Sequence, residues 1–217
     1  MNIVLPKTPF SYNDGAAIVE DNILYIYRQV DFYSLMSELT YACYVRERCY
    51  YCGKPITPSK LTVDHKIPRS FGGPTITNNL AQCCKSCNSR KGNMFEEEFW
   101  EFMQIETSPE LKKAFKEQVE QRQKLIYSGS LKVIPIEWLL KTKINVVSIR
   151  YQLNEPLGGG FHKAKKTIKK YGNFFKPIII SSNRHLLDGF NVCLLAKMYN
   201  VSDKLEIIQL DNVVCMY

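Results

Sequence analysis

Short apolar runs alternate with polar turn residues at the start of the chain, a pattern typical of β-strands. Residues 16–19 and 23–27 are rich in β-branched and aromatic side chains, and Asp21-Asn22 separates them. Asn and Asp favour tight turns because they tolerate positive φ and hydrogen-bond to nearby backbone. The sequence therefore predicts a strand pair with its turn at Asp21-Asn22.

Helical periodicity replaces this alternation in three later segments. Apolar side chains recur three or four positions apart in residues 31–47 and again in residues 94–105, where most of them are aromatic. Ser108 and Pro109 then form a helix start, because Ser is a favoured N-cap and Pro fits the first helical position. We expect this third helix to run to about Tyr127 and to end in a Ser-Gly-Ser linker.

Strands and helices are predicted to alternate after residue 131, which is typical of an α/β unit. A flexible bend at Leu157–Gly160 precedes a strongly basic helix. The predicted elements are strands at 131–136, 177–181 and 205–210, a helical turn at 137–140, and helices at 163–171 and 189–199. These patterns divide the chain into residues 1–106, a helical linker 107–130 and a C-terminal unit 131–217.

Composition fits an ordinary globular protein, with 45% hydrophobic and 23% charged residues. No apolar run reaches the length of a membrane span, and the first residues lack the charged start and apolar stretch of a signal peptide. We therefore expect a soluble protein of the cytoplasm that does not associate with membranes.

The formal charge of +8 is unevenly distributed along the chain. Residues 1–95 hold 11 basic against 7 acidic side chains, residues 96–130 hold 5 against 8, and residues 131–217 hold 13 against 6. Basic surface attracts phosphate backbones, so the two basic ends favour a nucleic-acid partner. Charge alone is equally compatible with a merely solvated surface.

Eight cysteines without a secretion signal favour metal ligation over disulfides. Cys49 and Cys52 form one C-x-x-C knuckle, and Cys84 and Cys87 form a second. Four thiolates in two such knuckles match a closed, tetrahedral structural zinc site. A redox pair is the alternative, and Cys83 could take the place of Cys84, although only Cys84 gives the two-residue spacing.

Further polar motifs occupy the 31 residues between the knuckles and the residues just after them. They are Asp64-His65, Gly72-Gly73, Asn79-Leu80 and Cys87-Asn88-x-x-Lys91-Gly92. In this combination residues 49–95 resemble the HNH (ββα-metal) endonuclease family. The pattern of that family is Asp-His on a strand, a Gly-Gly loop, Asn-Leu on the next strand and Cys-Asn-x-x-Lys-Gly entering a helix.

The resemblance implies a metal-dependent endonuclease that hydrolyses DNA phosphodiester bonds through a one-metal mechanism. His65 would be the general base, and Asp64 and Asn88 would hold a catalytic Mg²⁺ or Mn²⁺. Asn79 would hold the loop and orient His65. Asn88 stands where many members carry a second His, but its carbonyl oxygen still suits a hard divalent ion. A neutral imidazole can take a proton from water near pH 7.

Each of these residues has a simpler interpretation when it is taken alone. His65 could be a structural histidine on a half-buried strand, and Asn79 could be only a turn residue. Four cations in the same stretch are candidate phosphate contacts, or plain solvated charges: Lys66, Arg69, Arg90 and Lys91.

Residues 131–215 resemble, through fewer residues, the ParB/sulfiredoxin superfamily. Lys176-Pro177 begins an apolar strand, and Asp188-Gly189 opens a helix whose N-terminus binds a phosphate in that family. The Arg that usually follows the Asp-Gly turn is missing, which argues against nucleotide hydrolysis and for a binding or targeting role. The predicted fold class is α+β, with a ββα-metal HNH zinc domain joined through a helical segment to a small α/β ParB/sulfiredoxin-like domain.

Two other functions remain compatible with the sequence. A non-catalytic zinc-stabilised nucleic-acid-binding module would keep the cysteines and the basic charge but would not need Asp64, His65 or Asn88. A structural or assembly protein is the third possibility. Compact HNH modules belong to phages, mobile elements and restriction systems, so the resemblance implies such a setting. The sequence leaves open the target, DNA versus RNA, and the oligomeric state.

Overall fold

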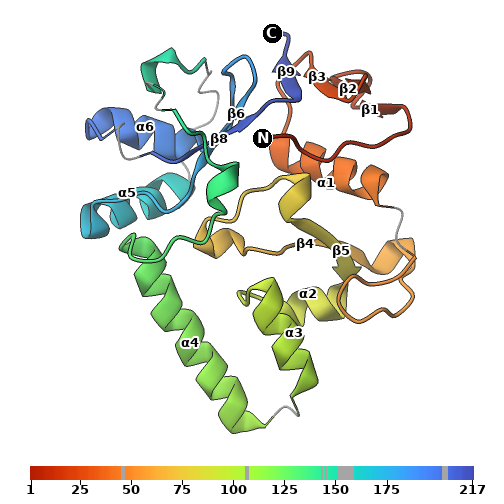
Figure 1. Ribbon diagram of the computed structural model, residues 1–217, viewed down its shortest axis with the longest axis vertical. Helices are drawn as coiled ribbons and strands as arrows, with labels where there is room; N and C mark the ends of the chain where they lie inside the picture. The colour runs from red at the N-terminus through yellow and green to blue at the C-terminus, as the bar shows by residue number, and fades with distance from the viewer. Residues whose placement is uncertain (45–46, 106–107, 143, 145, 151–158, 202–204) are drawn as a thin grey trace.

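The computed structural model has a mixed α+β architecture (Figure 1). A two-stranded sheet lies between two larger sheets on one side and a pair of projecting helices on the other. The structure describes the whole chain except residues 45–46, 106–107, 143, 145, 151–158 and 202–204. Among the residues that it describes, no helix combines the length and apolar character needed to cross a membrane.

The first sheet contains three N-terminal strands and one strand from the other end of the chain. Its order is β1 (Phe10–Tyr12), β2 (Ala17–Glu20), β3 (Ile23–Ile26) and β9 (Val213–Cys215). The predicted strand pair is confirmed, and both turn residues have positive φ, 48° at Asp21 and 60° at Asn22. The parallel pairing of β9 with β3 was not foreseen.

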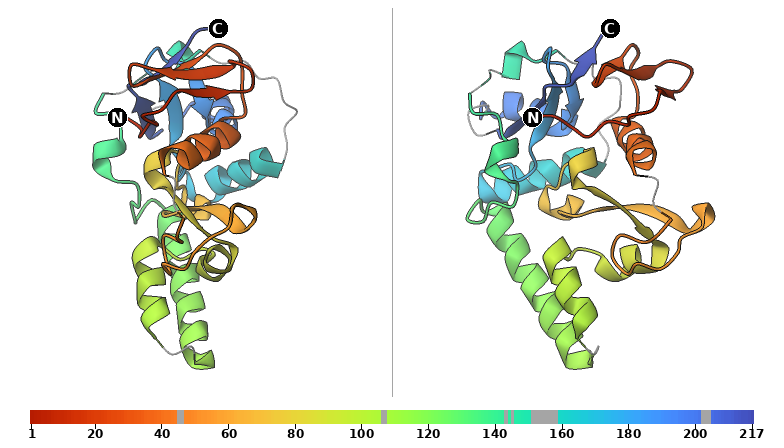
Figure 2. Two further views of the ribbon diagram at one scale, coloured as in Figure 1. Left: turned by 90° about the vertical axis from the view of Figure 1, so that its right-hand side faces the viewer. Right: turned by 45° about the vertical axis from the view of Figure 1, so that its right-hand side comes forward.

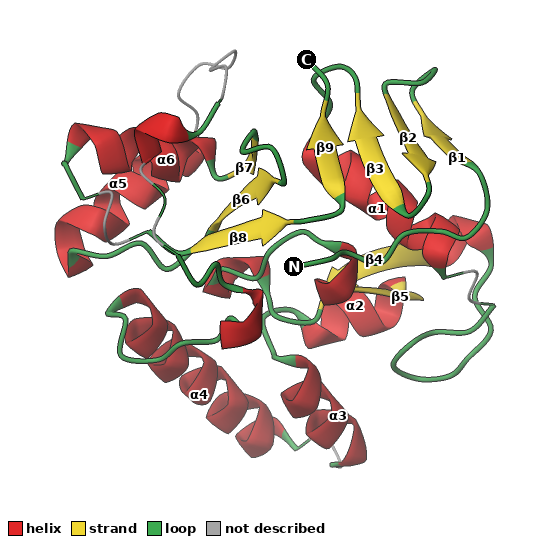
Figure 3. Ribbon diagram, turned by 45° about the horizontal axis from the view of Figure 1, so that its top comes forward, coloured by secondary structure: helices red, strands yellow, loops and turns green. Residues whose placement is uncertain are grey.

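Helix α1 (Phe32–Cys43) lies against this sheet (Figure 3) and confirms the first predicted helix. Asp31 caps it by accepting the Ser34 backbone N–H at 3.2 Å. The helix ends at Cys43, before the predicted end at residue 47.

The central unit is a two-stranded antiparallel sheet followed at once by a helix. Strand β4 (Leu61–His65) pairs with β5 (Leu80–Cys84), and α2 (Lys85–Lys91) begins at the next residue. Short 3-10 turns lie before β4 at Pro58–Lys60 and within the connecting loop at Arg69–Phe71 and Thr77–Asn79. The order β4, β5, α2 agrees with the predicted ββα unit.

Helices α3 (Glu96–Gln104) and α4 (Pro109–Tyr127) run side by side and project away from the sheets (Figures 1 and 2). Both helices were predicted. Ser108 is the N-cap of α4, as expected, and its hydroxyl accepts the Leu111 backbone N–H at 3.1 Å. Phe99 and Phe102 are the buried residues of α3.

The C-terminal segment forms a three-stranded sheet with two helices on one side (Figure 3). Strand β6 (Ile178–Ser181) lies between β7 (Leu186–Asp188) and β8 (Ile207–Leu210). Its helices are α5 (Gly159–Tyr171) and α6 (Phe190–Met198).

The strand predicted at residues 131–136 is wrong. Of that run, Ile134 is buried whereas Ile136 is 78% exposed, and Pro135 between them has no N–H to give to a sheet. A 3-10 turn at Ile136–Trp138 replaces the end of the strand and covers the first two residues of the helical turn predicted at 137–140. Residues 157–158 of the predicted bend lie outside the described residues, and Gly159–Gly160 begin α5.

One hydrophobic core joins the two ends of the chain. It combines Leu24 and Leu35 from the N-terminal sheet and α1 with Ile179 and Ile208 of the C-terminal sheet. Asn212 strengthens this junction, since its side chain exchanges two hydrogen bonds of 2.9 Å with the Ile3 backbone. The C-terminal segment therefore packs directly on the N-terminal half instead of hanging from the α4 linker.

Candidate functional site

Four cysteines from two knuckles converge beside β5. Cys49 and Cys52 flank a tight turn that the Gly53 N–H closes on the Cys49 carbonyl at 3.0 Å, with Gly53 at φ 66°. Cys84 ends β5, and Cys87 lies in the first turn of α2. The four Sγ atoms lie within 4.8 Å of one another.

This donor set fits a zinc ion. Tetrahedral Zn–S bonds of about 2.3 Å place the sulfurs roughly 3.8 Å apart, which is within the observed spread. Burial raises the pKa of the Cys49 thiol, but the backbone N–H groups of Cys52, Cys84 and Tyr51 outweigh it and lower the pKa to about 7. Backbone amides thus already stabilise a thiolate at this corner.

Cys83 does not belong to the cluster. Its side chain is fully buried, and Thr62 of the neighbouring strand lies 3.6 Å from its sulfur. Because successive strand residues point to opposite faces, Cys83 and Cys84 cannot both reach the same centre. The two-residue spacing had favoured Cys84, and Cys84 is the one that joins the other three cysteines.

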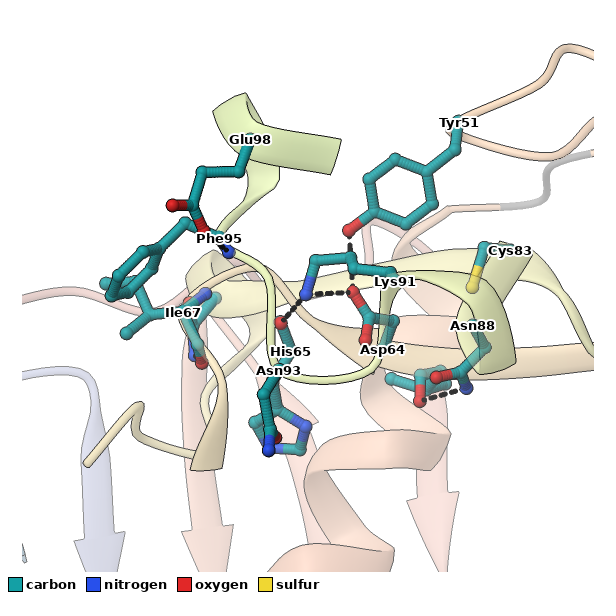
Figure 4. A network of polar contacts seen from close by, with 12 residues as sticks. Tyr51, Asp64, His65, Ile67, Cys83, Asn88, Lys91, Asn93, Phe95 and Glu98 are labelled. Carbon is teal, nitrogen blue, oxygen red and sulfur yellow. Dashed lines mark hydrogen bonds and ion pairs between the residues drawn. The ribbon is translucent and has the colours of Figure 1, made fainter. Parts of the chain in front are cut away.

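Asp64 lies on the face of β4 that α2 covers, and it is 6% exposed. The Tyr51 hydroxyl donates to its Oδ2 at 2.6 Å, and the Lys91 ammonium lies 3.0 Å from the same oxygen (Figure 4). Lys91 Nζ also donates to the His65 carbonyl at 2.7 Å. Neither contact of the carboxylate uses Oδ1.

Asn88 shares a face of α2 with Lys91, since the two are three residues apart. Its Nδ2 donates to Thr62 Oγ1 at 3.1 Å and to the Val63 carbonyl at 3.4 Å. Thr62 and Asp64 alternate onto the same face of β4. The structure therefore brings the side chains of Asp64 and Asn88 between β4 and α2. Both hydrogen bonds of the Asn88 side chain use Nδ2, and neither uses Oδ1.

His65 ends β4 and projects from the face opposite to Asp64. The pairing with β5 is regular, so no bulge turns the imidazole towards the carboxylate. His65 Nε2 lies 2.9 Å from Thr75 Oγ1, and the ring stacks on Tyr33 of α1 with centroids 6.1 Å apart. Asp64 and His65 thus border the strand end from two sides, linked by Lys91.

The surroundings of His65 disfavour its charged form. Burial is the main cause, the positive charges of Arg69, Lys91 and Lys176 add to it, and together they lower the pKa to about 4 although Asp188 acts in the opposite direction. The imidazole is therefore uncharged at neutral pH and able to accept a proton.

Asn79 holds the loop that follows His65. Its Oδ1 accepts the Ile67 N–H at 2.9 Å, and its Nδ2 donates to the carbonyls of Ile67 at 3.1 Å and Pro74 at 2.9 Å. The loop is too tight for a side chain at Gly73, where a Cβ atom would lie 1.8 Å from the Ile67 carbonyl oxygen. This bonding supports the loop-holding function predicted for Asn79.

Three of the four cations predicted to contact phosphates lie over aromatic rings near the surface. Lys66 lies 5.0 Å from the Tyr50 ring, and Arg69 lies 5.1 Å from the Tyr33 ring. Arg90 lies 5.8 Å from the ring of Phe102. Lys91 differs, because its side chain is 0% exposed and its ammonium is engaged by Asp64 and His65.

The C-terminal segment lies against the Gly-Gly loop. A Cβ atom on Gly72 would lie 2.4 Å from the Phe175 carbonyl oxygen, so the two backbones are in close contact. Next to Phe175, Lys176 forms a half-buried ion pair of 2.9 Å with Asp188, whose carboxylate also accepts the Gly189 N–H at 2.7 Å. The Asp-Gly turn that was predicted to face a phosphate therefore carries a lysine.

Sequence reasoning missed Tyr51, the pairing of Lys91 with Asp64, and Lys176. Tyr51 lies between Cys49 and Cys52, and the C-x-x-C motif predicts a function only for its two cysteines. Lys91 was predicted as a phosphate contact or a solvated charge, and its burial beside Asp64 was not foreseen. For Lys176 there was no signal, because its approach to the HNH-like loop depends on packing between distant segments.

The ββα unit and the four-cysteine cluster beside it form a small module. The segment that builds it, residues 49–102, matches the sequence profile of the HNH endonuclease family. Over 47 residues the chain is 49% identical to the CRISPR-associated endonuclease Cas9 of Corynebacterium diphtheriae. The aligned stretch is 21% of this chain and 4% of that protein. The resemblance predicted from the motifs is thus confirmed for this segment.

These matches concern a quarter of the chain, and within it they indicate a segment similar to HNH nucleases. The cysteine cluster can hold a metal such as zinc. The resemblance of residues 131–215 to the ParB/sulfiredoxin superfamily stays a prediction.

Proposed function

We propose that this protein is a metal-dependent endonuclease that hydrolyses DNA phosphodiester bonds at the β4–α2 site. The observation that carries the proposal is the placement of Asp64 and Asn88 between one strand and one helix, inside a segment that matches the HNH endonucleases. A module that only binds nucleic acid needs the cysteines but has no use for this pair.

The donor atoms suit one hard divalent ion. Tyr51 and Lys91 hold Asp64 Oδ2, and Thr62 holds the Asn88 nitrogen, so the oxygens left for a metal are Asp64 Oδ1 and Asn88 Oδ1. Oxygen donors favour Mg²⁺ or Mn²⁺. When bound, such an ion supplies Lewis-acid stabilisation of the phosphate and the leaving oxygen.

His65 is the proposed general base. In the tautomer that we propose, Nε2–H donates to the Thr75 hydroxyl and Nδ1 is the basic nitrogen, so that the neutral ring can take a proton from an attacking water. Asn79 fixes the loop that carries Thr75 and therefore acts as a positioning residue. Lys91 ties the Asp64 carboxylate to the His65 backbone and keeps the two sides of the strand end in register.

The remaining parts of the chain support the site. Zinc on the four cysteines would hold the base of α2, and with it Asn88, against β5. Lys66, Arg69 and Arg90 are proposed to position the DNA backbone, whereas the burial of Lys91 leaves it outside this group. We extend that group to Lys176, by which the C-terminal segment would aid DNA binding.

A plasmid-nicking assay tests the proposal. Zinc-loaded protein is incubated with supercoiled plasmid in Mg²⁺ or in EDTA, beside the variants His65→Ala and His162→Ala. His162 is an exposed histidine of α5 and serves as the matched control. We expect nicking that requires Mg²⁺, is unchanged in His162→Ala, and falls by about 10² or more in His65→Ala, with circular dichroism and zinc content showing that the variant is folded.

Two results would contradict this function. Nicking that survives in His65→Ala removes the proposed base. Absence of nicking with Mg²⁺ and Mn²⁺, from a zinc-loaded protein that binds DNA, would instead favour the non-catalytic binding module.

A further inference from the structure

A hollow outside the β4–α2 site lies between α2, α3 and α4. It has a volume of about 760 Å³, within the size range of pockets that enclose drug-sized ligands. Its lining among the described residues includes Arg90 and Lys91 of α2, Phe102 of α3, and Lys112, Phe115 and Lys116 of α4. We call it the α2–α4 groove.

Aromatic rings form the apolar part of the groove. Phe102 of α3 and Phe115 of α4 meet edge to face with centroids 5.5 Å apart, and Arg90 lies over the Phe102 ring. Phe102 is buried, whereas Phe115 is only partly buried and faces the hollow. The partly exposed Phe115 ring is therefore the surface on which a flat aromatic group can stack.

The polar part of the groove is mostly cationic. Arg90, Lys112 and Lys116 are exposed lining residues, and Glu120 is the acidic one. Two further lysines of α4, Lys113 and Lys124, do not line the groove although the helix also exposes them. The excess of positive charge is thus complementary to a polyanion.

The groove adjoins the proposed nuclease site through Lys91. This residue lines the groove, and its ammonium is the group that pairs with Asp64. Arg90 precedes Lys91 in α2 and lines the same groove as the α4 lysines Lys112 and Lys116. Continuity with a phosphodiester site distinguishes this hollow from an isolated pocket.

We infer that the α2–α4 groove binds a single-stranded nucleic-acid segment flanking the cleaved phosphodiester, with its phosphates on Arg90, Lys112 and Lys116 and a base on Phe115. Non-specific single-strand sites combine a positive groove with aromatic platforms in this way. A duplex would offer its phosphates to the rim but would keep its bases away from the ring. The inference rests on the proposed nuclease function, which it supplies with a second contact surface.

The test compares two double variants that change the net charge equally on the same helix. Lys112→Ala with Lys116→Ala removes two groove lysines, and Lys113→Ala with Lys124→Ala removes two lysines outside it. Binding of a short fluorescent oligodeoxythymidine is measured by anisotropy over a range of salt concentrations without added divalent ion. For the groove pair we expect the salt slope to fall by about 1.4, which is roughly 20-fold weaker binding at 0.1 M salt.

A third variant tests the stacking contact. Phe115→Leu keeps an apolar side chain but removes the ring, so we expect roughly ten-fold weaker binding of the oligomer and no change for a blunt duplex. Melting temperatures and zinc content identify any variant that is merely unfolded. The difference between oligomer and duplex binding thus tests the stacking contact separately from the charges.

Several outcomes would overturn the inference. Equal losses in the two lysine pairs would mean that the groove makes no special contact, and equal loss of duplex binding in Phe115→Leu would exclude a single strand as its occupant. These measurements need no cleavage, so they separate the two proposals. A protein that binds through the groove but never nicks DNA contradicts the nuclease function alone.

Discussion

Asp64 is a nearly enclosed carboxylate whose two partners come from opposite directions, Tyr51 from the first cysteine knuckle and Lys91 from the end of α2. A buried charge destabilises the fold unless its partners compensate it. Removal of one partner therefore lowers the free energy of unfolding. The orientation of the Asp64 side chain therefore depends on the packing of β4, the first cysteine knuckle and α2.

The first prediction concerns the hydroxyl of Tyr51. Tyr51→Phe removes the 2.6 Å bond to Asp64 Oδ2, and burial and the nearby carboxylate raise the pKa of Tyr51, which keeps this hydroxyl a donor. We expect the free energy of unfolding to fall by about 2 kcal/mol, because the bond has a charged acceptor. Urea unfolding of the zinc-loaded protein measures this.

Tyr41→Phe is the matched control, because Tyr41 is 37% exposed on α1. An equal loss of stability in the two variants would show that the Asp64 contact contributes nothing particular.

The second prediction concerns Gly73. Gly73→Ala places a Cβ atom against the Ile67 carbonyl, and the loop that Asn79 holds must open to relieve the clash. We expect a loss of about 3 kcal/mol in unfolding free energy, together with reduced nicking because Thr75 moves away from His65.

Gly172→Ala provides the comparison. Gly172 has φ 67°, and a Cβ atom at this position would meet nothing within 4 Å, so the cost of the substitution is backbone strain of about 1 kcal/mol. Equal stability of the two alanine variants would contradict the close approach at Gly73.

At the scale of elements, the four-cysteine cluster joins the first knuckle, the end of β5 and α2 to one small core. Cys49, Cys87 and Tyr51 belong to the same buried cluster as Phe99 and Phe102 of α3. Few apolar residues support this part of the chain, and small domains of this kind depend on metal for folding. Loss of zinc should therefore affect α3 as well as the knuckles.

The third prediction is that Cys52→Ser lowers the zinc content below one ion per chain and destabilises this module. We expect a loss of about 3 kcal/mol or more, equivalent to roughly 10 °C in melting temperature. Thermal melting and metal analysis provide the measurements. Cys43→Ser is the control, since Cys43 lies outside the cluster, and identical behaviour of both variants would remove the assigned ligand set.

Elements with local signals were predictable from the sequence. The turn at Asp21-Asn22 and the cap at Ser108 each depend on a few neighbouring residues, and both were confirmed. The pairing of β9 with β3 joins segments far apart in the chain, so β9 was missed. Strands β1 and β7 were missed because three residues are too few to show an alternating pattern. The strand at 131–136 was wrongly predicted because an apolar run does not reveal whether a partner edge exists.

The candidate site divides in the same way. Motif spacing predicted the cysteine ligands, and Cys49, Cys52, Cys84 and Cys87 do converge. The same spacing said nothing about Tyr51, because only the folded knuckle turns its ring towards β4.

At the scale of the whole molecule, the C-terminal segment lies on the loop beside the proposed nuclease site. The contact between Gly72 and Phe175 places Lys176 where its charge acts on His65. The shared core of Leu24 and Ile208 makes this arrangement part of the fold. We therefore expect substrate binding to depend on both ends of the chain.

The fourth prediction follows from Lys176. Lys176→Met removes one proposed phosphate contact, so we expect roughly ten-fold weaker DNA binding at 0.1 M salt and a salt slope smaller by about 0.9. Lys176→Arg should retain binding, and Lys170→Met on the exposed face of α5 is the control. Binding that is unchanged in Lys176→Met would leave the C-terminal segment without a contact to DNA.

The pairing of β9 with β3 has a consequence for synthesis of the protein. Leu24 and Val213 are partners in that ladder, although the ribosome makes one long before the other. At about 5–20 residues per second, the β3 edge remains unpaired on the nascent chain for on the order of 10 s or longer. An open strand edge is a template for pairing with other chains. Slow translation anywhere between β3 and β9 should therefore promote aggregation of this protein more than slow translation before β3.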